Sequence, residues 1–478
     1  MESAARALTM LAVFAATYKL LSWLTVKKDA LDRKLTAYGD IPITFRMAMP
    51  ATLVTGRSGS GKTTALVPVM QDVMGKCGFL GFTIKNDEPA QMCKVAAKIN
   101  KTPILFGCQH NNRINILRYA YHLGGTEGAV GLITALADIR RGGKDSHGKS
   151  FFTDAMANDV RYAVTILAAS DNLTMASLGK LVRSAPAQPG MVVEDSPYVK
   201  FHDLAVDRLG ALTLARRLDI EEAFTHFEYS RASWAADTRT SVAATLSSVL
   251  EPFQLSPTRE LLCTETNFTP AVLDEGAVIL LVDSVQDGGV RALMEQASLR
   301  YVAFLWAASR PANQTQPVAF WTDEAHRLLL RDQELTHLAT CRSHNVMNYL
   351  IVQDYDQIVD AMGKDRAGSV IANAPLRIAL AGDNPETVNQ IIKSAGESLH
   401  AIPAPGDRKS FDPTDTSADH STQAGVRFEY RPNLTATCLS SLRVGGKHGF
   451  CEALVYLGGR PFRSTCNHAF VRMKQRFL

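Results

Sequence analysis

Short apolar runs followed by polar residues recur along the chain, a pattern typical of buried parallel strands in an α/β sheet. These runs predict strands at residues 51–55, 78–84, 103–106, 277–282, 318–322, 349–352 and 376–380, and a final strand pair near 452–457. From about residue 119 to 260 the apolar residues recur instead at helical spacing, with loop breaks at 141–143 and 187–190. The pattern therefore predicts an α/β sheet domain whose chain is interrupted by an inserted all-α domain.

A glycine-rich segment follows the first predicted strand and precedes a helix-permissive stretch. It fits the Walker A pattern G-x-x-x-x-G-K-[ST] and reads Gly56-Arg57-Ser58-Gly59-Ser60-Gly61-Lys62-Thr63-Thr64. Glycines let backbone N–H groups converge on phosphate oxygens at a helix N-terminus, where the helix dipole also favours an anion. The segment therefore predicts an ATP site in which Lys62 reaches the β- and γ-phosphates and Thr63 supplies a hydroxyl to Mg²⁺. An ordinary glycine-rich turn is the alternative that this strand and helix context disfavours.

Two adjacent carboxylates, Asp323 and Glu324, directly follow the predicted strand at 318–322. A P-loop ATPase needs one carboxylate near Mg²⁺ and another that polarises the attacking water. We therefore assign Asp323 to the metal and Glu324 to the general base, in preference to an exposed acidic pair at a strand end. Gln353 ends the next predicted strand, where its amide either contacts the γ-phosphate and the water or only bonds solvent.

Arg342 precedes the strand predicted at 349–352. It is a candidate arginine finger, a planar cation that enters a neighbouring subunit's site and stabilises transition-state charge. A solvated surface arginine is the alternative. Lys85, Asp87 and Glu88 follow the strand predicted at 78–84, and they either lie beside the phosphates or form a salt-bridged loop.

Composition places the chain among ordinary folded proteins. Its 478 residues, 46% hydrophobic and 21% charged, leave room for two or three domains and exclude a disordered or fibrous chain. A net charge of +4 permits a nucleic-acid or anionic-membrane partner without demanding one. The eight cysteines show no C-x-x-C spacing and are expected to be reduced packing residues, and His326 and His337 are expected on helix faces because no third ligand accompanies them.

The N-terminus carries a membrane signal. Residues 7–26 are mostly apolar and contain one charged residue, Lys19, and twenty residues match the length needed to cross a bilayer. The basic pair Lys27-Lys28 favours a cytoplasmic location for everything that follows. The segment is therefore either a single membrane anchor or a helix that lies on a membrane surface or packs against another subunit.

These patterns together give a domain organisation. We expect an N-terminal hydrophobic segment at 1–30, the first part of a P-loop ATPase domain at 31–118, the inserted all-α domain at 119–260, and the second part of the ATPase domain at 261–478. Within the last part, residues 401–425 have the Pro- and Asp-rich composition of a loop and are expected to be mobile.

Several landmarks together give the chain a resemblance to type IV secretion coupling proteins, the family of conjugative DNA-translocating ATPases. The resemblance covers nearly the whole length from about residue 50. The landmarks are the Walker A segment, the cluster Ile84-Lys85-Asn86-Asp87-Glu88, the turn Arg113-Ile114-Asn115, the aromatic start of the insertion Ser150-Phe151-Phe152, the segment 268–276, Asp323-Glu324, the loop with Arg342 and the strand ending in Gln353, Asn373 before Leu376-Arg377-Ile378, and the tail segments 431–434, 452–455 and 459–461.

The resemblance implies a RecA-like P-loop α/β sheet with helices on both faces, plus the inserted all-α domain. It implies a homo-hexameric ring with the ATP site between subunits, in which Arg342 serves as the finger and Gln353 as the coupling residue. The implied partners are single-stranded DNA held without sequence preference, a relaxase or secreted protein substrate, and secretion channel components. The implied location is the cytoplasmic face of the bacterial inner membrane.

Two other functions compete with this interpretation. One is another hexameric ring ATPase, such as a secretion-assembly ATPase or a DNA packaging motor, whose hydrolysis does not respond to single-stranded DNA. The other is a recruitment scaffold that binds nucleotide for assembly and does not turn it over. The scaffold would keep its cargo binding when Glu324 is changed.

Overall fold

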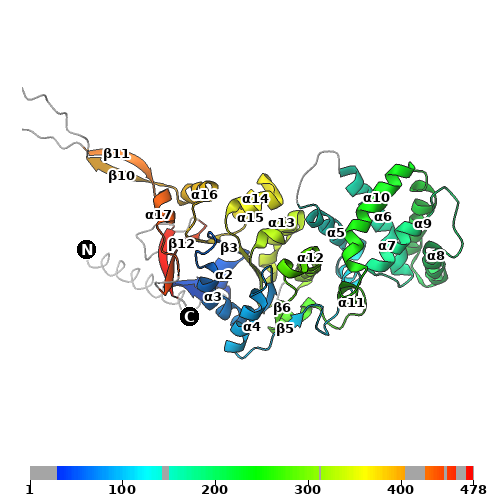
Figure 1. Cartoon of the computed structure of the whole chain (residues 1–478), viewed down its shortest axis with the longest axis horizontal. Helices are drawn as coiled ribbons and strands as arrows, with labels where there is room; N and C mark the ends of the chain where they lie inside the picture. Colours follow the sequence, from blue (N-terminus) through cyan, green and yellow to red (C-terminus); the bar gives the residue numbers. More distant parts are fainter. Residues whose placement is uncertain are drawn as a thin grey trace, which may run out of the picture.

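The computed structural model describes residues 30–142, 150–311, 314–403, 426–445, 449–458 and 470–476. A large sheet occupies the middle of an elongated molecule (Figure 1). A two-stranded hairpin projects from one end, and a bundle of helices forms the other end.

Nine of the described strands form one sheet in the order β13-β12-β9-β3-β8-β7-β4-β6-β5, and the other four form two antiparallel pairs, β1-β2 and β10-β11. The strands from β9 to β5 run parallel, and β12 and β13 continue the sheet in antiparallel pairing. The strands are β1 (Lys34–Tyr38), β2 (Ile41–Thr44), β3 (Ala51–Thr55), β4 (Gly78–Phe82), β5 (Ile104–Phe106), β6 (Val278–Leu281), β7 (Val318–Thr322), β8 (Val346–Ile351), β9 (Leu376–Leu380), β10 (Glu397–Pro403), β11 (Val426–Pro432), β12 (Phe450–Leu457) and β13 (Phe470–Arg476).

Helices cover both faces of this sheet, so every residue of β3, β4, β6, β7 and β8 is buried, as parallel strands require. The helices are α2 (Phe45–Ala48), α3 (Lys62–Lys76), α4 (Glu88–Lys98), α5 (Ile116–Arg140), α6 (Ser150–Ala169), α7 (Met175–Ser184), α8 (Pro197–Arg208), α9 (Leu214–Thr225), α10 (Ala236–Leu250), α11 (Thr258–Leu262), α12 (Val285–Ser309), α13 (Arg331–Thr340), α14 (Tyr355–Met362), α15 (Lys364–Ala372), α16 (Pro385–Ala395) and α17 (Ala436–Ser440).

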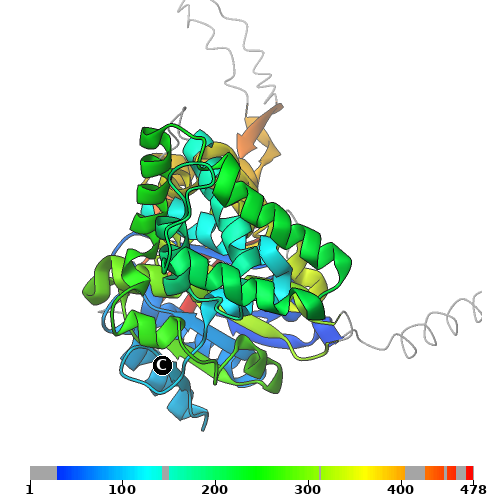
Figure 2. The ribbon, with the colours of Figure 1, turned by 90° about the vertical axis from the view of Figure 1, so that its right-hand side faces the viewer.

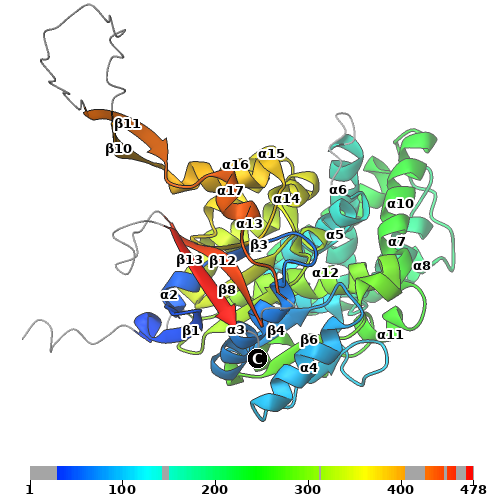
Figure 3. The same cartoon turned by 60° about the vertical axis from the view of Figure 1, so that its left-hand side comes forward.

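Alternate residues of one strand show how the two faces divide. Val54 of β3 packs with α3 and α4, whereas its neighbour Leu53 packs with α14, α15 and α16. Figure 3 shows α3 and α4 on one side of the sheet and α13 to α16 on the other.

The chain between β5 and β6 forms helices α5 to α11. These helices face the viewer in Figure 2 and share one apolar core with α12 and with Leu80 and Phe82 of β4. The long helices α5 and α12 lie against each other, so the insertion is packed onto the sheet domain rather than tethered to it. The exact domain boundaries given above stay a prediction.

Several strand limits differ from the sequence expectations. The strand expected at 349–352 begins at Val346, and the strand expected at 78–84 ends at Phe82. The expectation that 401–425 is entirely loop is wrong for residues 401–403, which belong to β10 and pair with β11. This hairpin was missed because its apolar residues alternate with polar ones, as in the V-R-F-E-Y-R-P of β11, and do not form the continuous apolar run of a buried strand.

Some expectations lie outside the described residues. They are the hydrophobic segment 7–26 with the basic pair Lys27-Lys28, the remainder of the loop at 404–425, the tail segment 459–461 and Cys466. Within the ranges described here, the structure contains no helix with the length and apolar character that a membrane crossing needs. The seven described cysteines are all free thiols, and Cys77, Cys263, Cys341 and Cys451 are buried.

A fully buried ion pair lies beneath the end of β7. Arg300 of α12 donates through Nη2 to Glu334 Oε1 of α13 at 2.6 Å, and neither side chain has any exposed surface. Arg300 also donates to the Thr322 hydroxyl at 3.0 Å. Thr322 immediately precedes Asp323. The Arg300–Glu334 pair therefore helps to hold in place the backbone that carries Asp323 and Glu324.

The Arg300→Met substitution is expected to lower the free energy of unfolding by about 3–5 kcal/mol, because it leaves the Glu334 carboxylate buried without its cation. Urea unfolding followed by circular dichroism measures this loss. The matched control is Glu127→Gln, which removes an exposed pair with Arg161 and should cost no more than about 1 kcal/mol. Equal losses in the two variants would contradict this account of the buried pair.

Candidate nucleotide-binding site

The Walker A segment forms a loop between β3 and α3, at the carboxyl edge of the parallel sheet. Gly59 and Gly61 adopt φ angles of +75° and +88°, which L side chains rarely adopt, and α3 begins immediately after Gly61. The loop is anchored to both neighbouring strands: the N–H of Gly56 donates to the carbonyl of Gln353, and the N–H of Arg57 donates to the carbonyl of Ala381, each at 3.0 Å.

The Lys62 side chain is buried and folds back over this loop. Its Nζ donates to the carbonyl oxygen of Gly56 and, at 3.3 Å, to that of Arg57. Burial lowers the pKa of Lys62, and the carboxylates of Asp323 and Glu324 partly oppose that change. Thr63 and Thr64, the next residues of α3, are exposed. The ammonium and the Thr63 hydroxyl thus stand at a helix N-terminus, where phosphate oxygens bind.

Asp323 and Glu324 lie across from the P-loop at the end of β7. The backbone N–H of Glu324 donates to Asp323 Oδ1 at 2.9 Å, and Glu324 adopts a φ of +46°. Gln353 Nε2 donates to Glu324 Oε1 at 3.2 Å, so the amide and the carboxylate are in direct contact. Lys85, which follows β4, lies 2.9 Å from Glu324 Oε1 and 3.6 Å from Asp323 Oδ2.

Lys85 and Gln353 together set the charge state of Glu324. Burial alone would raise the pKa of Glu324, but the hydrogen bond and charge of Lys85, together with the Gln353 amide, lower it below the ordinary value. Glu324 is therefore ionised at neutral pH, and its Oε1 is held by the Lys85 ammonium. The sequence left Lys85 either beside the phosphates or in a salt-bridged loop with Asp87 and Glu88, whereas its ion pairs in the structure are made with the carboxylates that follow β7.

Glu88 is a further acidic side chain at this site. It is 4% exposed and lines a small recess together with Thr63 and Asp323. Burial and the nearby Asp323 carboxylate raise the pKa of Glu88 well above its ordinary value. Asp87, its neighbour in sequence, is exposed.

Arg342 lies at the opposite edge of the sheet. It is exposed in the short turn Cys341–His344 that precedes β8, whereas the P-loop and Gln353 lie beyond the carboxyl ends of β3 and β8. The six residues of β8 separate the two edges by roughly 20 Å. Arg342 lines a cavity of about 480 Å³ with Arg46 and Asn373. Within one chain, therefore, the structure brings together Lys62, Thr63, Asp323, Glu324 and Gln353 but not Arg342.

His326 and His337 both lie in helical turns, as expected, but their surroundings differ. His337 is buried in α13 and stacks on Phe304 with the ring centroids 3.8 Å apart, and burial lowers its pKa to about 3. His326 is half-buried, with its Nδ1 3.7 Å from Glu324 Oε2. His337 is therefore a neutral core residue.

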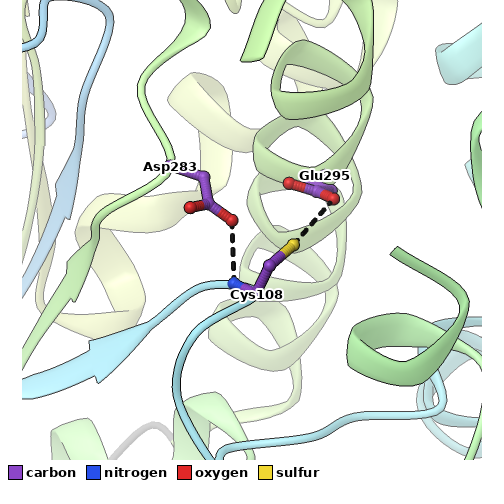
Figure 4. Close-up of side chains that lie close together, drawn as sticks. All are labelled: Cys108, Asp283 and Glu295. Carbon is purple, nitrogen blue, oxygen red and sulfur yellow. Dashed lines mark hydrogen bonds between the residues drawn. The ribbon is translucent and has the colours of Figure 1, made fainter. Parts of the chain in front are cut away.

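A cluster of metal-ligand residue types lies beyond the ends of β5 and β6. One atom each of Cys108, Asp283 and Glu295 lies within 4.8 Å of the others (Figure 4). Arg291 Nη1 already donates to both Glu295 oxygens, at 2.8 and 2.9 Å, and to Cys108 Sγ at 3.0 Å. Burial, reinforced by the Asp283 and Glu295 carboxylates, raises the pKa of the Cys108 thiol, so it is not the thiolate that a metal prefers.

Arg291 therefore supplies the positive charge of this cluster. Thr258 of α11 also donates its hydroxyl to Glu295 of α12. The cluster thus connects the ends of β5 and β6 to the last helix of the insertion, and we interpret it as a structural junction.

These features define a RecA-like P-loop nucleotide-binding protein. They are the glycine loop with its lysine and threonine, and the two adjacent carboxylates that follow β7, which is separated from β3 by β8. The donor set fits Mg²⁺ and a nucleoside triphosphate. It combines an ammonium at a helix N-terminus with hydroxyl and carboxylate oxygens, which are the ligands that Mg²⁺ prefers.

Comparison with known proteins is consistent with that class. Residues 317–437 match the family described as the TraM recognition site of TraD and TraG. The unbound bacterial conjugative coupling protein TrwBdeltaN70 is similar with a TM-score of 0.61 and 13% identity, over 95% of this chain and 90% of that chain. TrwB bound to the non-hydrolysable ATP analogue ADPNP has a TM-score of 0.62 and 14% identity, over 96% and 92% of the two chains.

TrwB bound to ADP and Mg²⁺ has a TM-score of 0.62 and 13% identity, over 93% of this chain and 90% of that chain. No curated protein sequence matches the chain. The predicted fold class and the predicted resemblance to coupling proteins are confirmed by these findings. At this level of identity the structural matches concern the fold.

Sequence reasoning missed two contacts at the site. It treated Glu324 and Gln353 separately, although they are hydrogen-bonded, and it left open whether Glu88 lies beside the phosphates or in a salt-bridged loop. The signal for Glu88 was its place directly before Pro89, at a helix start that follows a buried strand. Only the folded chain shows that it faces Thr63 and Asp323.

Proposed function

We propose that this chain is an ATP-driven coupling protein of a type IV secretion system, which moves single-stranded DNA or nucleoprotein toward the secretion channel. The observation that carries the proposal is the convergence of Lys62, Thr63, Asp323, Glu324 and Gln353 at one edge of the sheet. TrwB, a plasmid coupling protein, shares the fold and binds ADPNP in one structure and ADP with Mg²⁺ in another.

The proposed roles follow from position. The P-loop from Gly56 to Thr64 holds the phosphates through its N–H groups, and Lys62 neutralises the β- and γ-phosphates. Mg²⁺, when bound through Thr63 and Asp323, offsets the charge that develops on the phosphate oxygens. Glu324 orients the attacking water and accepts its proton after Lys85 has moved away.

Gln353 donates to Glu324 and is linked to the P-loop through its carbonyl. It is therefore suited to report γ-phosphate loss to the rest of the chain. Arg342, exposed at the opposite edge, completes the site of the next subunit. This arrangement needs a ring, and we propose the homo-hexamer of the coupling protein family.

Partners and location follow from the same family. Single-stranded DNA would pass through the ring without sequence readout, which agrees with the mildly basic net charge of +4. The match of residues 317–437 to the TraM recognition site of TraD and TraG supports a partner-recognition role for this region, with a relaxase or secreted protein as cargo and channel components as acceptors. The proposed location is the cytoplasmic face of the bacterial inner membrane.

Two rivals remain to be tested against this function. A ring ATPase that assembles a secretion apparatus or packages DNA would hydrolyse ATP without stimulation by single-stranded DNA. A recruitment scaffold would bind nucleotide and show no turnover. The pairing of a candidate base with a candidate coupling amide, Glu324 with Gln353, favours turnover over the scaffold.

The Lys62→Ala protein is expected to lose at least about 100-fold in ATP affinity. The substitution removes the buried ammonium, and each hydrogen bond from a charged group contributes about 1.5–3 kcal/mol. Equilibrium binding of a fluorescent ATP analogue measures the loss. Lys98→Ala, which removes an exposed lysine in the last turn of α4, is the control and should bind like the parent. Near-parental affinity in Lys62→Ala would refute the nucleotide site itself.

A further inference from the structure

The two carboxyl oxygens of the buried Glu88 side chain differ in their hydrogen bonds. Its Oε2 accepts from the N–H of Ile84 at 2.6 Å and from the N–H of Lys85 at 3.1 Å. Its Oε1 is buried and has no hydrogen-bond partner among the described residues. A buried, unpaired carboxylate oxygen is costly, so a purely structural role leaves half of this side chain unexplained.

The surroundings of Glu88 indicate what the second oxygen faces. The recess that it lines also contains Thr63 and Asp323, the hydroxyl and the carboxylate assigned above to Mg²⁺. The remaining walls are formed by Gln91 and by apolar side chains that include Trp321, Met70 and Met92. Three of the four polar side chains that line the recess, Thr63, Glu88 and Asp323, offer hard oxygen donors, and two of these are carboxyl groups.

Helix capping does not account for this arrangement. Glu88 is the first residue of α4, where a carboxylate is favoured by the helix dipole, but such a side chain normally stays in solvent. Here the backbone just beyond β4 holds Oε2, which fixes the carboxyl group in place and leaves Oε1 free. Lys85, the nearest cation to the paired carboxylates, is engaged by Asp323 and Glu324.

We propose that Glu88 is a second carboxylate of the magnesium site, whose Oε1 would accept a hydrogen bond from a water ligand of Mg²⁺. Mg²⁺ keeps several of its waters and is usually held by one or two carboxylates together with phosphate oxygens. A residue that orients such a water changes metal affinity by about 10–100-fold. Glu88 is thus a positioning residue, and this inference rests on the proposed ATP site.

The Glu88→Gln substitution tests the role without disturbing the local fold. The glutamine carbonyl oxygen can still accept from the N–H groups of Ile84 and Lys85, while the negative charge is lost. We expect the binding of ADPNP in EDTA to stay within about twofold of the parent. The Mg²⁺ concentration that gives half of the metal-dependent gain in ADPNP affinity should rise by about 10–100-fold.

Two further measurements separate a metal role from a structural one. The midpoint of urea unfolding without metal should not fall in Glu88→Gln, because the amide keeps the size of the side chain and its backbone contacts. With Mn²⁺ in place of Mg²⁺ and ADPNP bound, the electron paramagnetic resonance spectrum should change. Asp87→Asn, at the exposed neighbouring position, should match the parent in all three measurements.

The outcomes distinguish failure of the proposed ATP site from failure of the Glu88 inference. If the parent shows no metal-dependent ADPNP binding, the proposed ATP site fails and the Glu88 inference fails with it. If the parent shows that dependence and Glu88→Gln has the same Mg²⁺ requirement, the Glu88 inference alone is overturned. A fall in the unfolding midpoint together with an unchanged Mg²⁺ requirement would return Glu88 to a structural role.

Discussion

ATP turnover by the Arg342→Ala protein is expected to fall by about 10³–10⁵-fold, the range in which arginine fingers act. The physical reason lies in the two edges of the sheet. Arg342 is exposed before β8, whereas the P-loop follows the carboxyl end of β3, so the guanidinium cannot reach the phosphates of its own chain. It can act only in the site of an adjacent subunit.

Mixing subunits tests this geometry directly. Arg342→Ala subunits keep an intact P-loop, and Lys62→Ala subunits keep an intact finger, so some interfaces of a mixed ring combine both. Activity should therefore pass through a maximum as the ratio is varied at constant total protein. A flat titration would count against Arg342 as a finger in trans, and near-parental activity of Arg342→Ala alone would make it a solvated surface residue. Ser343→Ala, in the same exposed turn, is the control and should be fully active.

The Glu324→Gln protein is expected to bind ATP but to turn it over about 10²–10⁴-fold more slowly, because the amide keeps the size of the side chain and loses its basicity. Lys85 holds the pKa of Glu324 below its ordinary value, so the parent carboxylate is already ionised at neutral pH. The defect should therefore persist across neutral pH.

Steady-state phosphate release, measured beside equilibrium nucleotide binding, separates the two effects of Glu324→Gln. The control is Glu386→Gln, which neutralises an acidic residue in the first turn of α16. Unchanged hydrolysis in Glu324→Gln would refute the assignment of the base. Complete absence of turnover in the parent protein would instead favour the recruitment scaffold.

The sequence was most informative where function depends on neighbouring residues. The P-loop, its flanking strand and helix, and the carboxylates after β7 were all located from local pattern, because each combines a buried apolar run with the polar residues that end it. The order of the strands in the sheet could not be predicted from local pattern. It places β8 between β3 and β7, and this arrangement depends on contacts between residues hundreds of positions apart.

The remaining features depend on that tertiary arrangement. The contact between Gln353 and Glu324 follows from the adjacency of β8 and β7, and the burial of Glu88 follows from α4 lying close to α3. Neither has a local signature. The hairpin of β10 and β11 was missed for a related reason. Every described position of β11 is exposed, and its apolar residues Val426, Phe428 and Tyr430 alternate with polar residues instead of forming the continuous apolar run by which the buried strands were recognised.

The central claim is that ATP hydrolysis at this site drives the movement of single-stranded DNA. The most direct test is the rate of ATP hydrolysis by the full chain, in detergent, with and without single-stranded DNA of mixed sequence, with the Glu324→Gln protein as the blank. The account predicts turnover that rises with single-stranded DNA, is insensitive to its sequence, and is absent from the blank. Turnover that ignores single-stranded DNA at concentrations that saturate binding would contradict the account.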